Sequence, residues 1–323
     1  MLPSVPTVIS IRSATISCLL AAAAVGSSIA VTPVIADFPV YAGQAGRYAL
    51  AALVLALALP VLDPGRAGLL PGARQLVRLV VAAATGSAGF NVLLVLATRH
   101  ADPAAIGAVV GASPVVLAVL GAPRGSRRPQ RGVVVGAMLA TAGVLALQGT
   151  GHSSATGLLL ASAVLACEVA FTLVAAPLLP ALGPVRVSVF SCAIAASLLA
   201  GAAAISGVPL RRPTGAEGAT LVYQGLVMTA VAFVLWYRGV ARLGPDRAGV
   251  TMAAAPVAAA VVAAVVGTGR LGLATALGAG AVALGVALAT RGQTGVAGSA
   301  QGGDQGAQPR VVEQALHRDE ALR

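Results

Sequence analysis

Long apolar runs, separated by short polar or proline-containing links, dominate the hydrophobic pattern of this chain. A helix needs about 20 apolar residues to cross the hydrocarbon core of a bilayer, so runs of this length predict transmembrane helices. The ten runs cover residues 13–33, 42–62, 76–97, 103–122, 132–149, 155–176, 185–207, 218–237, 246–266 and 271–290. The pattern therefore predicts an all-α integral membrane protein with ten transmembrane helices.

The two ends of the chain differ from these runs. Residues 1–12 are expected to form a short cytoplasmic N-terminus, and the Gly/Gln-rich residues 291–323 a disordered cytoplasmic tail, because they cannot bury a core. The first run has an alternative interpretation. A lone arginine, an apolar stretch and small residues at Ser28 and Ala30 are also typical of a cleaved signal peptide.

The second half of the pattern repeats the first. Prolines and glycines recur at a common separation of 142 residues: Pro103/Pro245, Gly107/Gly249, Pro114/Pro256, Gly136/Gly278 and Gly143/Gly285. Residues 13–149 and 155–290 are therefore predicted to be two copies of one unit. Each copy has five spans, and an odd number inserts the second copy upside down, so the copies are inverted repeats, as in many secondary transporters.

Composition supports the membrane class, and charge predicts the orientation. The chain is 58% hydrophobic and 10% charged, whereas soluble domains have about 25% charged residues. Before the tail, twelve arginines fall in links on one predicted side, and four (Arg99, Arg211, Arg212 and Arg270) on the other. The positive-inside rule then places both termini in the cytoplasm. The net charge of +11 indicates topology rather than a nucleic-acid partner, because the arginines form no single patch.

Several kinds of chemistry have no motif here. Cys18, Cys167 and Cys192 lie in apolar runs without metal-ligand spacing, and are interpreted as packing thiols. The three histidines share no ligand spacing, and neither a phosphate-binding loop nor a nucleophile–base pair is visible. No metal, cofactor or enzymatic activity is therefore expected.

Glu168 is the acidic residue that falls deep inside a predicted span. An ionised carboxyl group at the bilayer centre costs about 2.5–3.5 kcal/mol on insertion scales, so such a residue is a functional candidate. Burial favours the neutral form, which allows proton exchange when water gains access. The alternatives are proton coupling or binding of a cationic substrate, and a structural acid hydrogen-bonded to a neighbouring helix.

Two other polar residues lie within the spans. Arg47 either extends outward to anchor its helix at the outer surface, or faces a cavity, where it pairs with Glu168 or with an anionic substrate. Asn91 either joins two helices or offers hydrogen bonds to the cavity.

Aromatic residues and prolines supply further candidates. Trp236 and Tyr237 close the eighth span and indicate either the headgroup belt or a gate of the cavity. Pro114 and Pro256 lie in the middle of matched spans, where each removes a backbone hydrogen bond, so they are candidate hinges.

Four stretches carry a resemblance to a known family: "AVGSSIAVTP" (24–33), "GRYALAALVLAL" (46–57), and the two proline-containing helix pairs at 93–120 and 232–262. They resemble the drug/metabolite transporter superfamily, specifically its EamA-type ten-helix exporters, over about residues 13–290. Val25 stands where that family usually has Trp, and Pro33 near a frequent Lys. The resemblance implies two five-helix bundles around a central cavity, and outward transport of small metabolites or amphipathic compounds.

The predicted function is thus secondary active transport across the cell membrane by alternating access. A membrane-embedded enzyme, a lipid-handling protein and a non-transporting accessory protein are the alternatives. The expected partners are a small-molecule substrate and the lipid bilayer, and proton coupling and a homodimer are open. No nucleic acid is expected as a partner.

Overall fold

The computed structural model describes residues 11–66, 70–97, 99–101, 103–121, 130–148, 154–265, 267 and 271–291. Within these residues the regular structure is helical, as the sequence predicts. The α-helices are α1 (Ile11–Val31), α2 (Val40–Leu62), α3 (Ala73–Ala83), α4 (Phe90–Ala97), α5 (Pro103–Val110), α6 (Ser113–Leu120), α7 (Arg131–Gln148), α8 (Ala155–Ala175), α9 (Leu179–Ile205), α10 (Gly215–Tyr223), α11 (Ala232–Leu243), α12 (Pro245–Met252), α13 (Ala254–Val265) and α14 (Leu273–Thr290). The predicted N-terminal segment up to residue 10 and the tail beyond Arg291 lie outside the described residues.

Short 3-10 and π segments join or interrupt these helices. The 3-10 segments are η1 (Thr32–Ile35), η2 (Pro64–Arg66) and η4 (Ala176–Leu178), and the π segments are η3 (Ala84–Gly89) and η5 (Gln224–Val231). Because η3 joins α3 to α4 and η5 joins α10 to α11, each π segment lies inside a longer helical rod. Single π turns of this kind often occur at functional sites.

Helices account for the membrane-compatible character of the fold, since a helix satisfies its own backbone hydrogen bonds in lipid. Seven segments of the described chain are long and apolar enough to cross a membrane, and Arg131–Leu147 is a shorter apolar helix. The difference from ten predicted spans arises at three places. The run 103–122 is divided into α5 and α6, α7 is short, and the sixth and seventh runs merge into Ala155–Ile205 because the turn between them is mostly helical.

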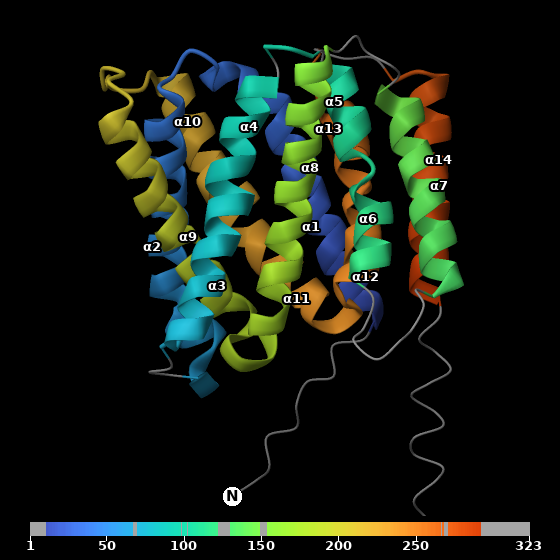
Figure 1. Ribbon diagram of the computed structural model, residues 1–323, viewed down its shortest axis with the longest axis horizontal. Helices are drawn as coiled ribbons and strands as arrows, with labels where there is room; N and C mark the ends of the chain where they lie inside the picture. The colour runs from blue at the N-terminus through green and yellow to red at the C-terminus, as the bar shows by residue number, and fades with distance from the viewer. Residues whose placement is uncertain are drawn as a thin grey trace, which may run out of the picture.

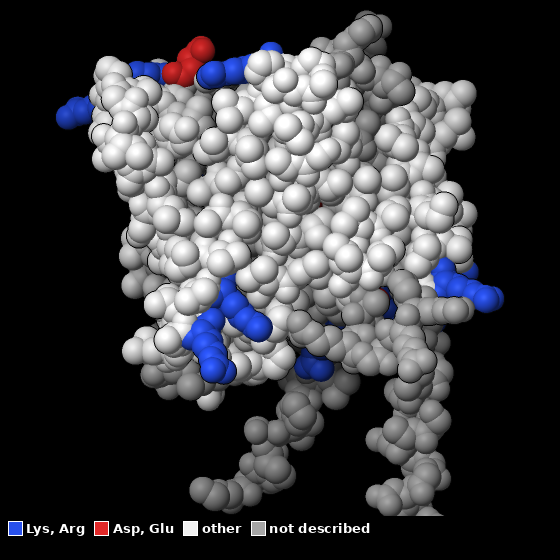
Figure 2. Space-filling view, in the orientation of Figure 1, with Lys and Arg blue, Asp and Glu red and all other residues white. Residues whose placement is uncertain are grey.

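The helices stand side by side as one bundle, and most run between its two ends (Figure 1). The start of α1 and the end of α14 both lie at the lower end of the view in Figure 1. The face shown in Figure 2 has Arg side chains near both ends and a broad uncharged belt between them. This distribution is typical of a protein whose middle lies in hydrocarbon.

α1 lies within the bundle rather than at its edge. It packs against α11, α12 and α13, and it buries Ala14, Cys18 and Ala21 in the largest hydrophobic cluster. A Cβ atom at Gly239 of α11 would overlap the Cys18 sulfur, so the two helices are in close contact. This central position favours retention of α1 in the mature protein over its removal as a signal peptide.

Interruptions of the helices recur at the separation of the proline and glycine pairs. α5 and α12 have the same length, and both their first residues (Pro103, Pro245) and their last residues (Val110, Met252) differ by 142 positions. The π segments η3 and η5 end at Gly89 and Val231, which differ by the same number. Two independent kinds of helix irregularity therefore occupy matched positions in the two halves.

The glycines of α7 and α14 meet each other in the structure. Gly143 faces Gly278 and Gly136 faces Gly285, so the two helices pack antiparallel. A Cβ atom on Gly143 would lie 2.6 Å from the Gly278 carbonyl oxygen, which only glycine permits. The 142-residue offset converts one pair into the other, since Gly143 corresponds to Gly285 and Gly278 to Gly136. This exchange is expected for an interface between two related copies.

Candidate functional site

Glu168 lies on α8 at the point where the helical rod of α5 and α6 is interrupted. Its Oε1 accepts a hydrogen bond from Ser113 Oγ at 3.2 Å, and its Oε2 is buried without a hydrogen-bond partner among the described residues. Ser113 is the first residue of α6, directly before Pro114 and after the turn at Gly111 and Ala112. The acid therefore contacts a break in the neighbouring rod.

The matched position in the other half has an apolar contact. Subtracting 142 from Glu168 gives Gly26 on α1, and adding it to Ser113 gives Ala255 on α13. Gly26 packs so closely on α13 that an added Cβ would lie 2.8 Å from the Ala258 Cβ and would overlap the Ala255 carbonyl oxygen. The hydrogen bond between α8 and α6 thus corresponds to close apolar packing between α1 and α13 in the other half.

Arg47 lies on α2 and is buried, with 4% of its surface exposed. Its Nη1 donates to Gln224 Oε1 and to Met228 Sδ, both at 3.4 Å, and its guanidinium carbon lies 4.6 Å from the Tyr48 ring centroid. The interpretation of Arg47 as an anchor at the outer surface is therefore wrong, because the side chain turns into the protein. Its partner is also Gln224 rather than Glu168.

Gln224 and Met228 belong to η5, and sequence reasoning did not single them out. Gln224 is 1% exposed, and its Nε2 donates to Thr32 Oγ1 at 3.2 Å. It therefore connects α2 with η1, directly after α1, through Arg47 and Thr32. A glutamine within an apolar run is the signal in the sequence that could have identified this connection.

The side chain of Asn91 makes its hydrogen bond within its own helical rod. Its Nδ2 donates to the backbone carbonyl of Ser87, four residues earlier, within η3. The amide therefore caps a carbonyl in the π segment, and neither the interhelical link nor the cavity contact predicted for it is among the described hydrogen bonds. The Ser87 hydroxyl beside it is buried without a partner among the described residues.

Trp236 and Tyr237 lie inside the bundle, with 5% and 0% of their surfaces exposed. The headgroup-belt interpretation is therefore wrong for both residues, because the belt would leave them accessible to lipid. Tyr237 packs its ring 5.6 Å from Phe171 of α8 and 6.0 Å from Phe233 of α11. Phe233 in turn lies 6.3 Å from Tyr48 of α2, so aromatic rings connect the helices of Glu168 and Arg47.

Pro114 and Pro256 each stand just after a helix interruption. α5 ends at Val110 and α6 begins at Ser113, whereas α12 ends at Met252 and α13 begins at Ala254. A proline removes one backbone hydrogen bond and crowds the preceding turn, which accounts for both breaks. Their role as hinges stays a prediction.

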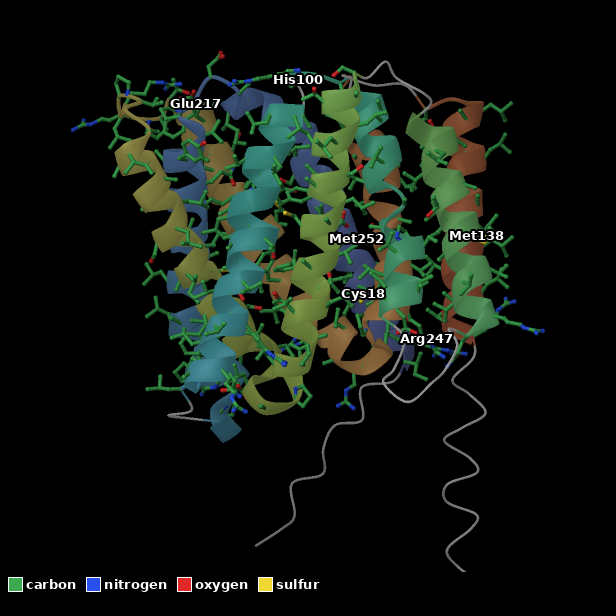
Figure 3. The ribbon with its side chains drawn as sticks, in the orientation of Figure 1. Cys18, His100, Met138, Glu217, Arg247 and Met252 are labelled. Carbon is green, nitrogen blue, oxygen red and sulfur yellow. The ribbon has the colours of Figure 1, made fainter. Side chains whose placement is uncertain are left out.

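Ion pairs hold segments at the two ends of the bundle. Glu217, labelled in Figure 3 at the same end as His100, accepts from Arg211 Nη1 at 2.8 Å and caps the start of α10 with Thr214. This hydrogen bond raises the pKa of Arg211, so the pair stays ionised. At the other end, labelled by Arg247, Arg186 Nε lies 3.2 Å from Asp63 Oδ2.

No group of three or more metal-ligating side chains is found in the described residues. Cys18, Cys167 and Cys192 are free thiols.

Comparison with known proteins shows similarity to transporters. Residues 155–291 match the EamA-like transporter family. The chain is 25% identical over 253 residues to the uncharacterized transporter YetK of Bacillus subtilis (strain 168), which covers 75% of this chain and 76% of YetK. A solved structure titled only "Crystal structure of protein" matches with a TM-score of 0.76 and 24% identity, over 87% of this chain and 97% of that one. At that identity it shows the fold alone. The EamA-like match in its second half and the similarity to a bacterial transporter over most of its length both support membership of the drug/metabolite transporter superfamily.

Proposed function

We propose that the protein is a secondary active exporter of small metabolites or amphipathic compounds, driven by protons through Glu168. The observation that carries this proposal is the half-buried carboxyl group of Glu168, whose Oε2 is buried without a partner among the described residues, at a break in the adjacent rod. Membership in a transporter family supports transport as the activity. Outward direction rests on the resemblance to EamA-type exporters.

The proposal includes ten spans arranged as two inverted five-helix repeats, 13–149 and 155–290, with both termini in the cytoplasm of a cell-membrane protein. The coincident helix irregularities and the exchanged glycine pairs of α7 and α14 support two related copies. When two related copies have opposite orientations, each can adopt the conformation of the other. The cavity then opens to one side of the membrane and afterwards to the other, which is alternating access.

The unequal contacts of α1 and α8 indicate which interface opens. Gly26 of α1 packs directly on the backbone of α13, and separating them would lose dispersion contacts along a close interface. α8 meets the start of α6 through the Ser113–Glu168 hydrogen bond, which water can replace. We infer that substrate and protons reach the centre beside α8.

Through its charge, Glu168 can couple proton binding to the opening of the interface beside α8. A neutral carboxyl group tolerates a dry, closed interface, whereas the ionised form needs water, a cation or more hydrogen-bond donors. Ser113 supplies one donor to Oε1, and Oε2 lacks one. Loss of the proton therefore favours an open, hydrated state, and protonation favours closure.

The export function is tested by comparing metabolites in cells and medium for three strains: wild type, a deletion of the gene, and the deletion complemented with Glu168→Gln. We expect at least one compound to fall in the medium and rise in the cells of the deletion strain, with no recovery by Glu168→Gln. Identical profiles in all three strains, under conditions in which the protein is expressed, would contradict the proposal.

The topology predicts which sites are accessible from each side. A tag at the C-terminus or in the 122–131 link should be labelled only after permeabilisation, because both are expected in the cytoplasm. A tag beside His152 should be labelled on intact cells. Labelling of the C-terminal tag on intact cells would imply an odd number of spans and remove the inverted-repeat arrangement.

The hinge role of the second proline predicts a kinetic effect. Pro256→Ala restores a backbone donor at the α12–α13 interruption, and should stiffen that rod while leaving folding and insertion intact. We expect exchange between inward- and outward-open states to slow several-fold, as measured by the transport rate at normal expression. Pro60→Ala, at an exposed position near the end of α2, is the control and should change nothing. Equal rates for both variants would reduce Pro256 to a packing residue.

A further inference from the structure

Arg47 is a buried cation without an acidic partner in the part of the chain that the structure describes. Its guanidinium group makes one long hydrogen bond to a neutral amide and one to a sulfur atom, and its Nε has no partner there. Other arginines near the bundle ends, such as Arg186 and Arg211, form ion pairs with Asp63 and Glu217. A buried charge of this kind normally has a counter-ion, because desolvation without one is expensive.

The surroundings of Arg47 offer further neutral polar groups to a ligand rather than another protein charge. It faces η5, whose π turn presents Gln224 and Met228 toward α2. Gln44, one turn earlier on α2, also has a buried oxygen without a partner in the described residues. Arg47 is the eighth residue of α2, about 10 Å along the helix from its start. Since only 4% of it is exposed, a lipid headgroup cannot reach it.

Aromatic rings begin directly beside this cation. Tyr48 stacks near the guanidinium group, Phe233 follows at 6.3 Å, and Phe171 and Tyr237 continue the cluster toward α8. Rings of this kind bind planar apolar groups through offset and edge-to-face contacts. A charged group at one end and aromatic surface at the other match a molecule that has both features.

We propose that the substrate carries a carboxylate, or a similar monoanionic group, that binds Arg47, and an aromatic or planar apolar portion that packs on the cluster of Tyr48, Phe171, Phe233 and Tyr237. The proposal rests on the transport function and deepens it by naming the substrate class. Arg47 selects for negative charge and the aromatic cluster selects for shape. Glu168, on the same helix as Phe171, remains the proton-binding group.

The test measures binding to the purified full-length chain in detergent by isothermal titration calorimetry. Three probes share one phenylpropyl body and differ in charge: 3-phenylpropionate, 3-phenylpropionamide and 3-phenylpropylamine. We expect the carboxylate to bind roughly ten- to hundredfold more tightly than the amide, the range of a charge-assisted hydrogen bond, and the amine to bind most weakly. Fluorescence of Trp236, the only tryptophan and the neighbour of Tyr237, should change with the same midpoint.

Variants locate the effect at Arg47. Arg47→Gln should bind acid and amide equally, whereas Arg47→Lys, which keeps the charge, should retain a preference of at least a few-fold. Arg131→Gln, an exposed arginine at the start of α7, removes the same charge elsewhere and should match the wild type. If Arg47→Gln does not fold, the comparison of the three probes on the wild type and on Arg47→Lys still decides the question.

Equal binding of acid and amide to the wild type, preference for the amine, or no binding of the acid would each overturn the proposal. An unchanged preference in Arg47→Gln would overturn it as well. The binding experiment and the metabolite profile test different proposals. If the protein selects carboxylates through Arg47 but the metabolite profiles do not differ, export is refuted and the proposed substrate class is retained.

Discussion

Glu168→Gln should abolish the dependence of transport on a pH gradient while the protein folds and inserts normally. Glutamine preserves the shape of the side chain and still accepts a hydrogen bond from Ser113, but its amide does not ionise. We expect gradient-driven flux to fall at least tenfold in proteoliposomes that transport the compound identified by the metabolite profile. Exchange of that compound without a gradient should remain.

Ser113→Ala is the matched control for this experiment. It removes the hydrogen-bond donor to Oε1 and leaves the carboxyl group in place, so pH-driven flux should persist. Full pH-driven flux in Glu168→Gln would mean that the carboxyl group is structural and that another group couples transport to protons. Loss of pH dependence in both variants would instead assign the effect to the contact between α6 and α8.

Gly285→Leu should strongly destabilise the protein, whereas Gly280→Leu on the same helix should have little effect. Gly285 faces the backbone of α7, where a Cβ atom would lie 2.8 Å from the Ala140 nitrogen and would overlap the Gly136 carbonyl oxygen. Gly280 has no atom within 4 Å of such a Cβ. Overpacking a close interface costs about 1–3 kcal/mol, and more when the obstacle is backbone that cannot rotate away.

Thermal unfolding in detergent and the yield of monodisperse protein measure this effect. We expect a clearly lower melting temperature and yield for Gly285→Leu, and values near the wild type for Gly280→Leu. Gly143→Leu in α7 should behave like Gly285→Leu, because it faces Gly278 in the matched half of the same interface. Similar stability of Gly285→Leu and Gly280→Leu would contradict the close packing of α7 and α14.

The sequence predicted the helical class and the places where prolines interrupt helices, because both depend on local chemistry. Apolar runs demand helices in lipid, and a proline removes a hydrogen bond in any surroundings. The interruptions before Pro114 and Pro256 accordingly lie at matched positions in the structure. The two π segments were not predicted, since nothing distinctive in their residues marks an inserted turn.

Side-chain environments were harder to predict, as Arg47, Trp236 and Tyr237 illustrate. An arginine two turns from a helix end can reach outward or turn inward with similar local geometry, and aromatic residues near a span end fit both a headgroup belt and a core. The choice depends on which helix lies alongside. In this protein η5 lies against α2 and presents Gln224 to Arg47, while α8 presents Phe171 to Tyr237.

By itself, the sequence determined that the chain is a helical membrane protein, that its halves share a pattern of prolines and glycines, and that Glu168 is an acid inside an apolar run. These follow from composition and spacing, which act along one segment at a time. Only the tertiary structure decided that Glu168 meets Ser113 at a break, that Gly26 packs on the backbone at Ala255, and that Arg47 is buried against Gln224 and Met228. Those relations join residues more than 50 positions apart, so they depend on which helices pack together, and no single run contains that information.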